Sequence, residues 1–176
     1  MRRRQVLVGA TGAALAASAG CLGSSGTSGD AGGGADDALA VVETLDARGS
    51  STGEQRVPVS GTPTLVDLFA TWCAPCRAQM DELVPVHQTY ADRVAFLSVT
   101  NERFGGGLSA ADVREWWREH DGNWTVGHDP DSVLMRELQA GGLPFTALFD
   151  ASGEVVWTHR GVASESTVRS EVESVL

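Results

Sequence analysis

Residues 66–77 read V-D-L-F-A-T-W-C-A-P-C-R, and this stretch decides the fold. It begins as an apolar, β-prone run and ends in two cysteines, Cys73 and Cys76, after which a helix-like pattern follows. Two intervening residues let the sulfurs meet across one helical turn, and a pair at such a strand-to-helix junction is typical of redox chemistry. We therefore predict that the pair opens to a dithiol and closes to a disulfide.

The two cysteines are expected to play different roles. A helix that begins near Pro75 points unpaired N–H groups and the positive end of its dipole at Cys73. This field favours the thiolate, so Cys73 is the predicted nucleophile. Cys76 lies one turn into the helix and is predicted to resolve the mixed disulfide.

The composition argues against some partners. All 13 basic residues are Arg, and they face 23 Asp plus Glu, for a formal net charge of −10. A surface this acidic repels phosphate backbones, so we expect no nucleic-acid partner. The loss of Lys together with the excess of acid fits adaptation to high salt and fits plain solubility equally well.

Residues 1–20 are interpreted as a targeting segment. Arg3-Arg4-Gln5-Val6-Leu7 fits the twin-arginine pattern, and the weakly apolar run that follows is shorter than the roughly 20 residues that span a bilayer. An uncleaved transmembrane anchor is therefore the less favoured alternative. Ser18-Ala19-Gly20-Cys21 then resembles the cleavage box of lipoproteins, in which the cysteine becomes the lipidated N-terminus, although Ser18 departs from the usual apolar residue.

Cys21 is also the odd cysteine left once the pair is assigned, which argues against the alternative of an incidental free thiol. Residues 21–39 are rich in Gly and Ser, cannot bury a core, and are expected to form a flexible tether. The folded domain is expected to span residues 40–176.

Strand and helix patterns fill the predicted domain. Strands are expected near residues 41–45, 55–59, 64–70, 94–99, 124–126, 145–149 and 154–159, with helices after Cys76, from Ser109, from Asp129 to Leu138 and from Ser164. Ser109 and Asp112 have the spacing of a capping box, and Pro85 should kink or split the first helix. The paired Trp116 and Trp117 are interpreted as core rather than as a ligand cage. This order of elements predicts an α/β three-layer domain.

The pattern resembles the thioredoxin superfamily over residues 40–176 and is most similar to its membrane-anchored TlpA/ResA-like branch. The residues that carry the resemblance are Trp72-Cys73-Ala74-Pro75-Cys76 after a buried strand, and Gly142-Leu143-Pro144 before the next-to-last strand. The resemblance implies a central mixed sheet, an N-terminal β-hairpin, and a strand and helix inserted between Val99 and Asp129.

The resemblance also implies a set of site residues. Pro144 is expected to be a cis-proline that faces the cysteine pair, and the backbone of Leu143 is expected to bind the extended substrate chain. Asp67 matches a buried acid that helps to deprotonate Cys76; the alternative is a solvated acid at a strand edge. The expected catalytic residues are Cys73, Cys76, Asp67, Trp72, Pro75 and Pro144, and the expected substrate contacts are Leu143, Pro144, Trp72 and Ala74. Gln79 and Asp81 depart from the family, which often has Glu and Pro there.

The implied function is thiol–disulfide exchange by a lipid-anchored monomer on the extracytoplasmic face of the cell membrane, with no cofactor beyond the Cys73–Cys76 disulfide. The Ala74-Pro75 dipeptide resembles that of reducing members, which favours a reductant recharged by a membrane electron donor. The expected substrates are proteins with disulfides or dithiols, and apocytochrome c is one that the family suggests.

Three other classes are weighed against this function. Copper carriers on the same fold space their cysteines by three residues and add a histidine, whereas His87, His120, His128 and His159 show no motif spacing, so no metal site is expected. Peroxidatic loops place a threonine three residues before the cysteine, whereas Thr71 is two before Cys73. A docking module that merely retained the fold would not need both cysteines.

Overall fold

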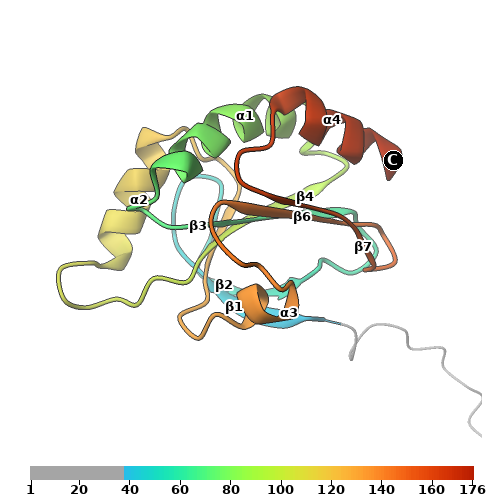
Figure 1. Ribbon diagram of the computed structural model, residues 1–176. Coiled ribbons are helices and arrows are strands. Elements are labelled where there is room, and N and C mark those ends of the chain that lie inside the picture. Colours follow the sequence, from blue (N-terminus) through green and yellow to red (C-terminus); the bar gives the residue numbers. More distant parts are fainter. Residues whose placement is uncertain (1–37) are drawn as a thin grey trace, which may run out of the picture. The chain divides into compact units, whose positions relative to one another are not determined.

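The computed structural model describes residues 38–176 (Figure 1). The predicted targeting segment, the predicted lipidation site Cys21 and most of the predicted tether lie outside the described residues. The elements, in chain order, are β1 (Ala40–Thr44), β2 (Gly53–Val57), β3 (Thr64–Phe69), α1 (Ala74–Tyr90), β4 (Ala95–Thr100), α2 (Ala110–Glu119), β5 (Thr125–His128), α3 (Val133–Glu137), β6 (Phe145–Phe149), β7 (Val155–Arg160) and α4 (Glu165–Ser174).

The strands form one mixed sheet in the order β2-β1-β5-β4-β3-β6-β7. Strands β3, β4 and β5 are parallel, whereas β6 runs antiparallel to both β3 and β7. Strands β1 and β2 form the predicted N-terminal hairpin, and β1 also pairs antiparallel with β5. The inserted segment is also confirmed, as α2 followed by β5, and together these features give a thioredoxin-like fold.

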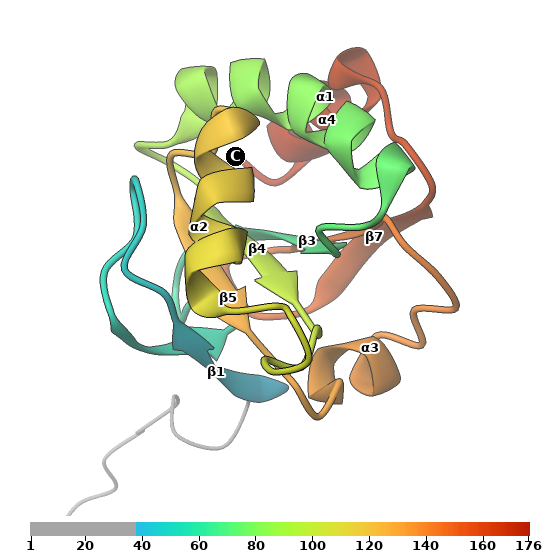
Figure 2. The ribbon, with the colours of Figure 1, turned by 90° about the vertical axis from the view of Figure 1, so that its left-hand side faces the viewer.

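Helices cover both faces of the sheet, as the three-layer prediction requires (Figures 1 and 2). Helices α1, α2 and α4 pack on one face and α3 on the other. Alternate side chains of β3 pack on the two faces of the sheet, because successive side chains of a strand point in opposite directions. Leu65 and Phe69 join the cluster under α1, while Val66 and Leu68 join the cluster under α3.

Helix α1 runs through Pro85 without interruption, so of the two predicted effects, a kink or a split, the split does not occur. A proline inside a helix removes one backbone hydrogen bond and crowds the preceding turn. Packing holds the two halves together, because Met80 and Leu83 before the proline and Val86 and Tyr90 after it are all buried in the same cluster.

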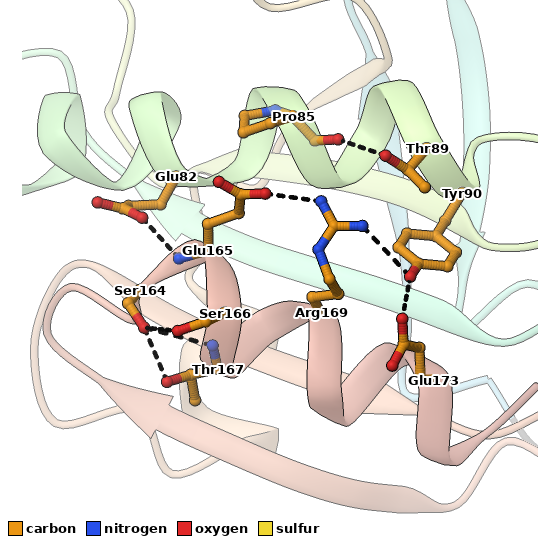
Figure 3. Close-up of polar contacts among 10 residues, drawn as sticks. All are labelled: Glu82, Pro85, Thr89, Tyr90, Ser164, Glu165, Ser166, Thr167, Arg169 and Glu173. Atoms are coloured by element: carbon orange, nitrogen blue, oxygen red, sulfur yellow. Dashed lines mark hydrogen bonds and ion pairs between the residues drawn. The ribbon is translucent and has the colours of Figure 1, made fainter.

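A polar network fastens α4 to α1 (Figure 3). The Tyr90 hydroxyl donates to Glu173, and Arg169 donates both to that hydroxyl at 3.3 Å and to Glu165 at 2.6 Å. Val168 and Val172 are buried beneath these contacts. The last helix is thereby held against the helix that begins at the cysteine pair.

Capping explains how two further helices begin. Ser109 and Asp112 form the predicted capping box of α2, whereas the predicted start of α3 at Asp129 is wrong. Helix α3 begins at Val133, because the preceding Ser132 adopts a left-handed conformation with φ of 55°, which a right-handed helix cannot include. Asp129 still serves this helix, since its carboxylate accepts a hydrogen bond from the Leu134 N–H at 2.9 Å.

Within residues 38–176, no helix combines the length and the apolar character needed to cross a membrane.

Candidate active site

Cys73 and Cys76 form a disulfide at the beginning of α1. Cys73 is the N-cap residue and has an extended backbone. Pro75 lies in the first turn, where a backbone N–H has no partner inside the helix, so its missing N–H removes no helical hydrogen bond. The Cys76 N–H donates to Cys73 Sγ at 3.3 Å, and the two Cα atoms are 5.3 Å apart. The predicted pair is therefore bonded across the first helical turn.

The two sulfurs differ in their access to solvent. Cys76 is completely buried and Cys73 is 4% exposed, whereas the neighbouring Trp72 is 72% exposed. Ala74 and Pro75 are also exposed and complete the surface around Cys73. An incoming sulfur can therefore approach Cys73 but not Cys76, which matches the predicted division of roles.

The electrostatic setting of Cys73 is that of a helix N-terminus whose first turn carries no acidic residue. The first turn of α1 has no acidic residue, so the helix dipole acts on the N-cap sulfur without an opposing carboxylate in that turn. A thiolate at this position is stabilised by the dipole and by the N–H that donates to Sγ. This is the arrangement expected of a nucleophilic cysteine.

Strand register brings Pro144 to the same edge of the sheet as the cysteine pair. Leu68 pairs with Phe145, so the residue before Phe145 lies beside the point where β3 ends and the loop to Cys73 begins. The Leu143–Pro144 peptide is cis, as the resemblance implied. The Pro144 carbonyl accepts a hydrogen bond from the Gly161 N–H at 2.9 Å, which fixes this loop to the end of β7.

Leu143 has free backbone groups at this edge. Among the described residues, neither its N–H nor its C=O has a hydrogen-bond partner, although its side chain packs against both core clusters. Backbone groups rarely stay unpaired unless solvent or a ligand satisfies them. An extended peptide can therefore add to this edge by pairing with Leu143.

Asp67 is buried beneath α1 and is not solvated, so the surface alternative is wrong. It faces the same side of β3 as Leu65 and Phe69, the side whose core cluster includes Cys76. Burial raises the pKa of Asp67 to about 7, and a hydrogen bond of 3.2 Å from the Ser98 hydroxyl only partly opposes this rise. The carboxyl group can therefore exchange a proton near neutral pH.

Asp67 belongs to a buried polar row that crosses three strands. In register it stands opposite Ser98 of β4 and Thr146 of β6. The Ser98 hydroxyl also accepts a bond of 3.0 Å from Trp124 Nε1, whereas Asp67 Oδ1 and Thr146 Oγ1 have no partner. The row thus leaves one acceptor of Asp67 available for a proton.

Glu102 was missed by the sequence analysis, although it holds the loop that leads to Cys73. Its carboxylate accepts hydrogen bonds from the Thr71 N–H at 2.7 Å, the Thr71 hydroxyl at 2.8 Å and the Thr100 hydroxyl at 3.0 Å. The available signal was its position two residues after β4, because the carboxyl ends of parallel strands gather at one edge.

Two of the histidines that were weighed as metal ligands pack against aromatic rings. His87 packs between Phe96 and Trp124, and His128 stacks on Phe104. Within residues 38–176, no three His, Cys, Asp or Glu side chains gather closely enough to hold a metal ion. No observation on these residues favours the copper alternative.

The fold and site together define the class of thioredoxin-like proteins with a Cys-x-x-Cys disulfide at a helix N-terminus. The chain belongs to the Redoxin family, whose pattern matches residues 36–176.

Individual proteins and solved structures are also similar to the chain. The chain is 26% identical over 132 residues to the thiol:disulfide interchange protein DsbE of Yersinia pestis, a match that covers 74% of this chain and 65% of that protein. MTB dsbF, solved in its mixed oxidized and reduced forms, superposes with a TM-score of 0.66 at 19% identity, over 80% of this chain and 97% of the other.

A secreted disulfide oxidoreductase from Mycobacterium tuberculosis, described as homologous to E. coli DsbE, gives a TM-score of 0.65 at 18% identity, over 80% and 99% of the two chains. At this identity, the structural likeness establishes the fold alone.

Proposed function

We propose that this protein is a thiol–disulfide oxidoreductase that reduces disulfides of other proteins outside the cytoplasm. The observation that carries the proposal is the Cys73–Cys76 disulfide at the start of α1, on the same sheet edge as the unpaired backbone of Leu143. Cys73 keeps a small exposed fraction, Cys76 is completely buried, and the unpaired backbone of Leu143 offers an extended substrate chain a place to bind.

The reaction begins from the dithiol form. The Cys73 thiolate attacks one sulfur of a substrate disulfide, a mixed disulfide forms, and the second substrate sulfur leaves as a thiolate. The Cys76 thiol then gives up its proton and attacks Cys73 Sγ, which expels the remaining substrate sulfur. The substrate gains two electrons, and the protein ends as the Cys73–Cys76 disulfide.

Asp67 is the proposed acceptor of the Cys76 proton. Its carboxyl group is buried on the same side of the sheet as Cys76, and its pKa of about 7 suits a base that works near neutral pH. A donor of two electrons and two protons must then restore the dithiol. We propose a membrane dithiol donor for this step, in line with the predicted lipid anchor at Cys21.

The sequence and the relatives support the proposed location and substrate. The twin-arginine and lipoprotein patterns of residues 1–21 support export and anchoring, and one relative of the same fold is described as secreted. Apocytochrome c, with its pair of haem-binding cysteines, is the substrate that we propose on the family resemblance. Normal haem attachment in a strain that lacks the gene would rule this substrate out.

The activity itself is tested with two single cysteine variants. Wild-type protein should reduce the disulfides of insulin in the presence of dithiothreitol, and Cys73→Ser should abolish this reduction. Cys76→Ser should keep the nucleophile and accumulate a mixed disulfide with the substrate, visible on a non-reducing gel. Equal activity in the wild type and in Cys73→Ser would contradict the proposal.

A further inference from the structure

Three arginines of the described domain lack a partner. Within the described residues, five arginines form ion pairs with carboxylates: Arg48, Arg93, Arg103, Arg118 and Arg169. Within residues 38–176, the side chains of Arg77, Arg114 and Arg160 make no hydrogen bond, ion pair or ring contact, whereas those of the other arginines do. An unpaired guanidinium in so acidic a protein is a candidate for binding an external anion.

Arg160 lies next to the loop that carries the cis-proline. It is the last residue of β7 and stands opposite Phe145 in register. The following residue, Gly161, donates its N–H to the Pro144 carbonyl at 2.9 Å. Two links of backbone pairing therefore fix the base of the Arg160 side chain beside Pro144 and Phe145.

The guanidinium group lies against two glycines that precede Leu143. A Cβ atom added to Gly142 would stand 3.1 Å from Arg160 Nη2 and 3.2 Å from Nε, and one added to Gly141 would stand 3.6 Å from Nη1. Neither glycine has a positive φ, so the backbone does not require glycine here. The missing side chains instead leave the space that the guanidinium occupies.

The guanidinium of Arg160 lies close to backbone groups that a substrate can bind. The N–H and C=O of Leu143 are unpaired, and a substrate chain that binds them must continue past Gly142 and Gly141. Arg160 is exposed, and no carboxylate of the described residues is close enough to pair with it. Its donors therefore lie beside these two glycines without an internal partner.

We propose that Arg160 selects disulfide substrates that carry an Asp or Glu next to the cysteine that Cys73 attacks. The inference rests on the proposed function and deepens it by naming a substrate class. The planar guanidinium would bind the substrate carboxylate with two N–H donors while the substrate backbone pairs with Leu143. The net charge of the protein predicts the opposite preference, because a charge of −10 repels acidic peptides.

The test uses three peptides with one internal disulfide that differ only in the residues that flank the attacked cysteine: Glu, Gln or Lys. The measured quantity is the ratio of their second-order rate constants with the reduced protein at low ionic strength. A ratio cancels any effect of a mutation on the nucleophile itself. Wild-type protein should favour the Glu peptide over the Gln peptide by about two- to fivefold, the range of an exposed ion pair, and the preference should shrink in high salt.

Two substitutions at Arg160 should move this ratio in a defined way. Arg160→Gln should react equally with the Glu and Gln peptides, and Arg160→Glu should favour the Lys peptide. Arg114→Gln is the matched control, because Arg114 is unpaired and exposed but lies in α2. Arg77→Gln removes the unpaired arginine that follows Cys76, and it should keep the preference.

Three outcomes would overturn the inference. These are a wild-type protein without preference for the Glu peptide, a preference that survives Arg160→Gln, and a preference that Arg114→Gln or Arg77→Gln lowers as much as Arg160→Gln does. A failure to reduce any of the three peptides would contradict the proposed function itself, and the inference with it.

Discussion

Glu102 binds Thr71 through both of its carboxylate oxygens, one accepting the backbone N–H at 2.7 Å and the other the hydroxyl at 2.8 Å. Thr71 lies two residues before Cys73, so this pair joins the loop after β4 to the loop that carries the nucleophile. The loop after β4 is held in turn by a hydrogen bond of 2.8 Å between the His128 ring and the Glu102 carbonyl.

Removal of this carboxylate should destabilise the oxidised protein. In Glu102→Ala, the Thr71 N–H loses its acceptor, and leaving such a donor without a partner costs about 1–3 kcal/mol. Glu102→Gln keeps one carbonyl acceptor and should cost less. Urea unfolding measures the free energy of unfolding of both variants. Equal stability of Glu102→Ala and wild type would show that the Glu102–Thr71 contact does not stabilise the fold.

Asp67→Asn should change how stability depends on pH. Because burial raises the pKa of Asp67 to about 7, the folded protein binds a proton more tightly than the unfolded chain, whose carboxyl has an ordinary pKa of 3.8. Wild-type stability should therefore fall as pH rises from about 4 to 7, by up to about 4 kcal/mol, and stay low above pH 7. Asn cannot lose a proton, so the variant should lack this fall.

The same variant also tests the proposed proton acceptor. Asp67→Asn should slow the release of substrate from the mixed disulfide near pH 7, while the first attack by Cys73 keeps its rate. Stopped-flow measurement separates the two steps. Asn matches Asp in shape, so an unchanged second step would show that Cys76 passes its proton elsewhere.

Gln79→Glu should destabilise the protein most at high pH. Gln79 is completely buried, and its amide binds Ala163 twice, accepting from the backbone N–H at 2.7 Å and donating to the C=O at 3.3 Å. A carboxylate cannot donate the second bond and would be buried with its charge. The loss should be about 1–3 kcal/mol at pH 8 and smaller at pH 4, where a protonated Glu can donate. Thermal unfolding at the two pH values measures it, and a loss independent of pH would contradict this reason.

Much of the fold could be predicted because local sequence and packing agree. The apolar run before Cys73 became the buried strand β3, and the capping box at Ser109 and Asp112 began α2 where it was expected. One local prediction failed, because the left-handed Ser132 delayed the start of α3. Helix α1 is continuous through Pro85, since buried residues on both sides of the proline pack in one cluster.

The site was only partly predictable. A spacing motif marks Cys73 and Cys76, and a family resemblance was needed to expect the cis peptide at Pro144. Glu102 and Arg160 carry no motif, because strand pairing brings each of them to its place from a distant part of the chain. The residues that they contact, Thr71 and the glycines before Leu143, can be identified only from the assembled sheet.

The reduction potential of the Cys73–Cys76 couple tests the central claim most directly. The protein is equilibrated in glutathione or dithiothreitol redox buffers, its free thiols are alkylated, and the products are counted by mass spectrometry. We predict one two-electron transition, in which the ratio of dithiol to disulfide changes tenfold per about 30 mV. Both thiols should appear together, at a potential nearer −270 mV than −120 mV. Thiols that react independently, or that never form a disulfide with each other under any oxidant, would contradict the account.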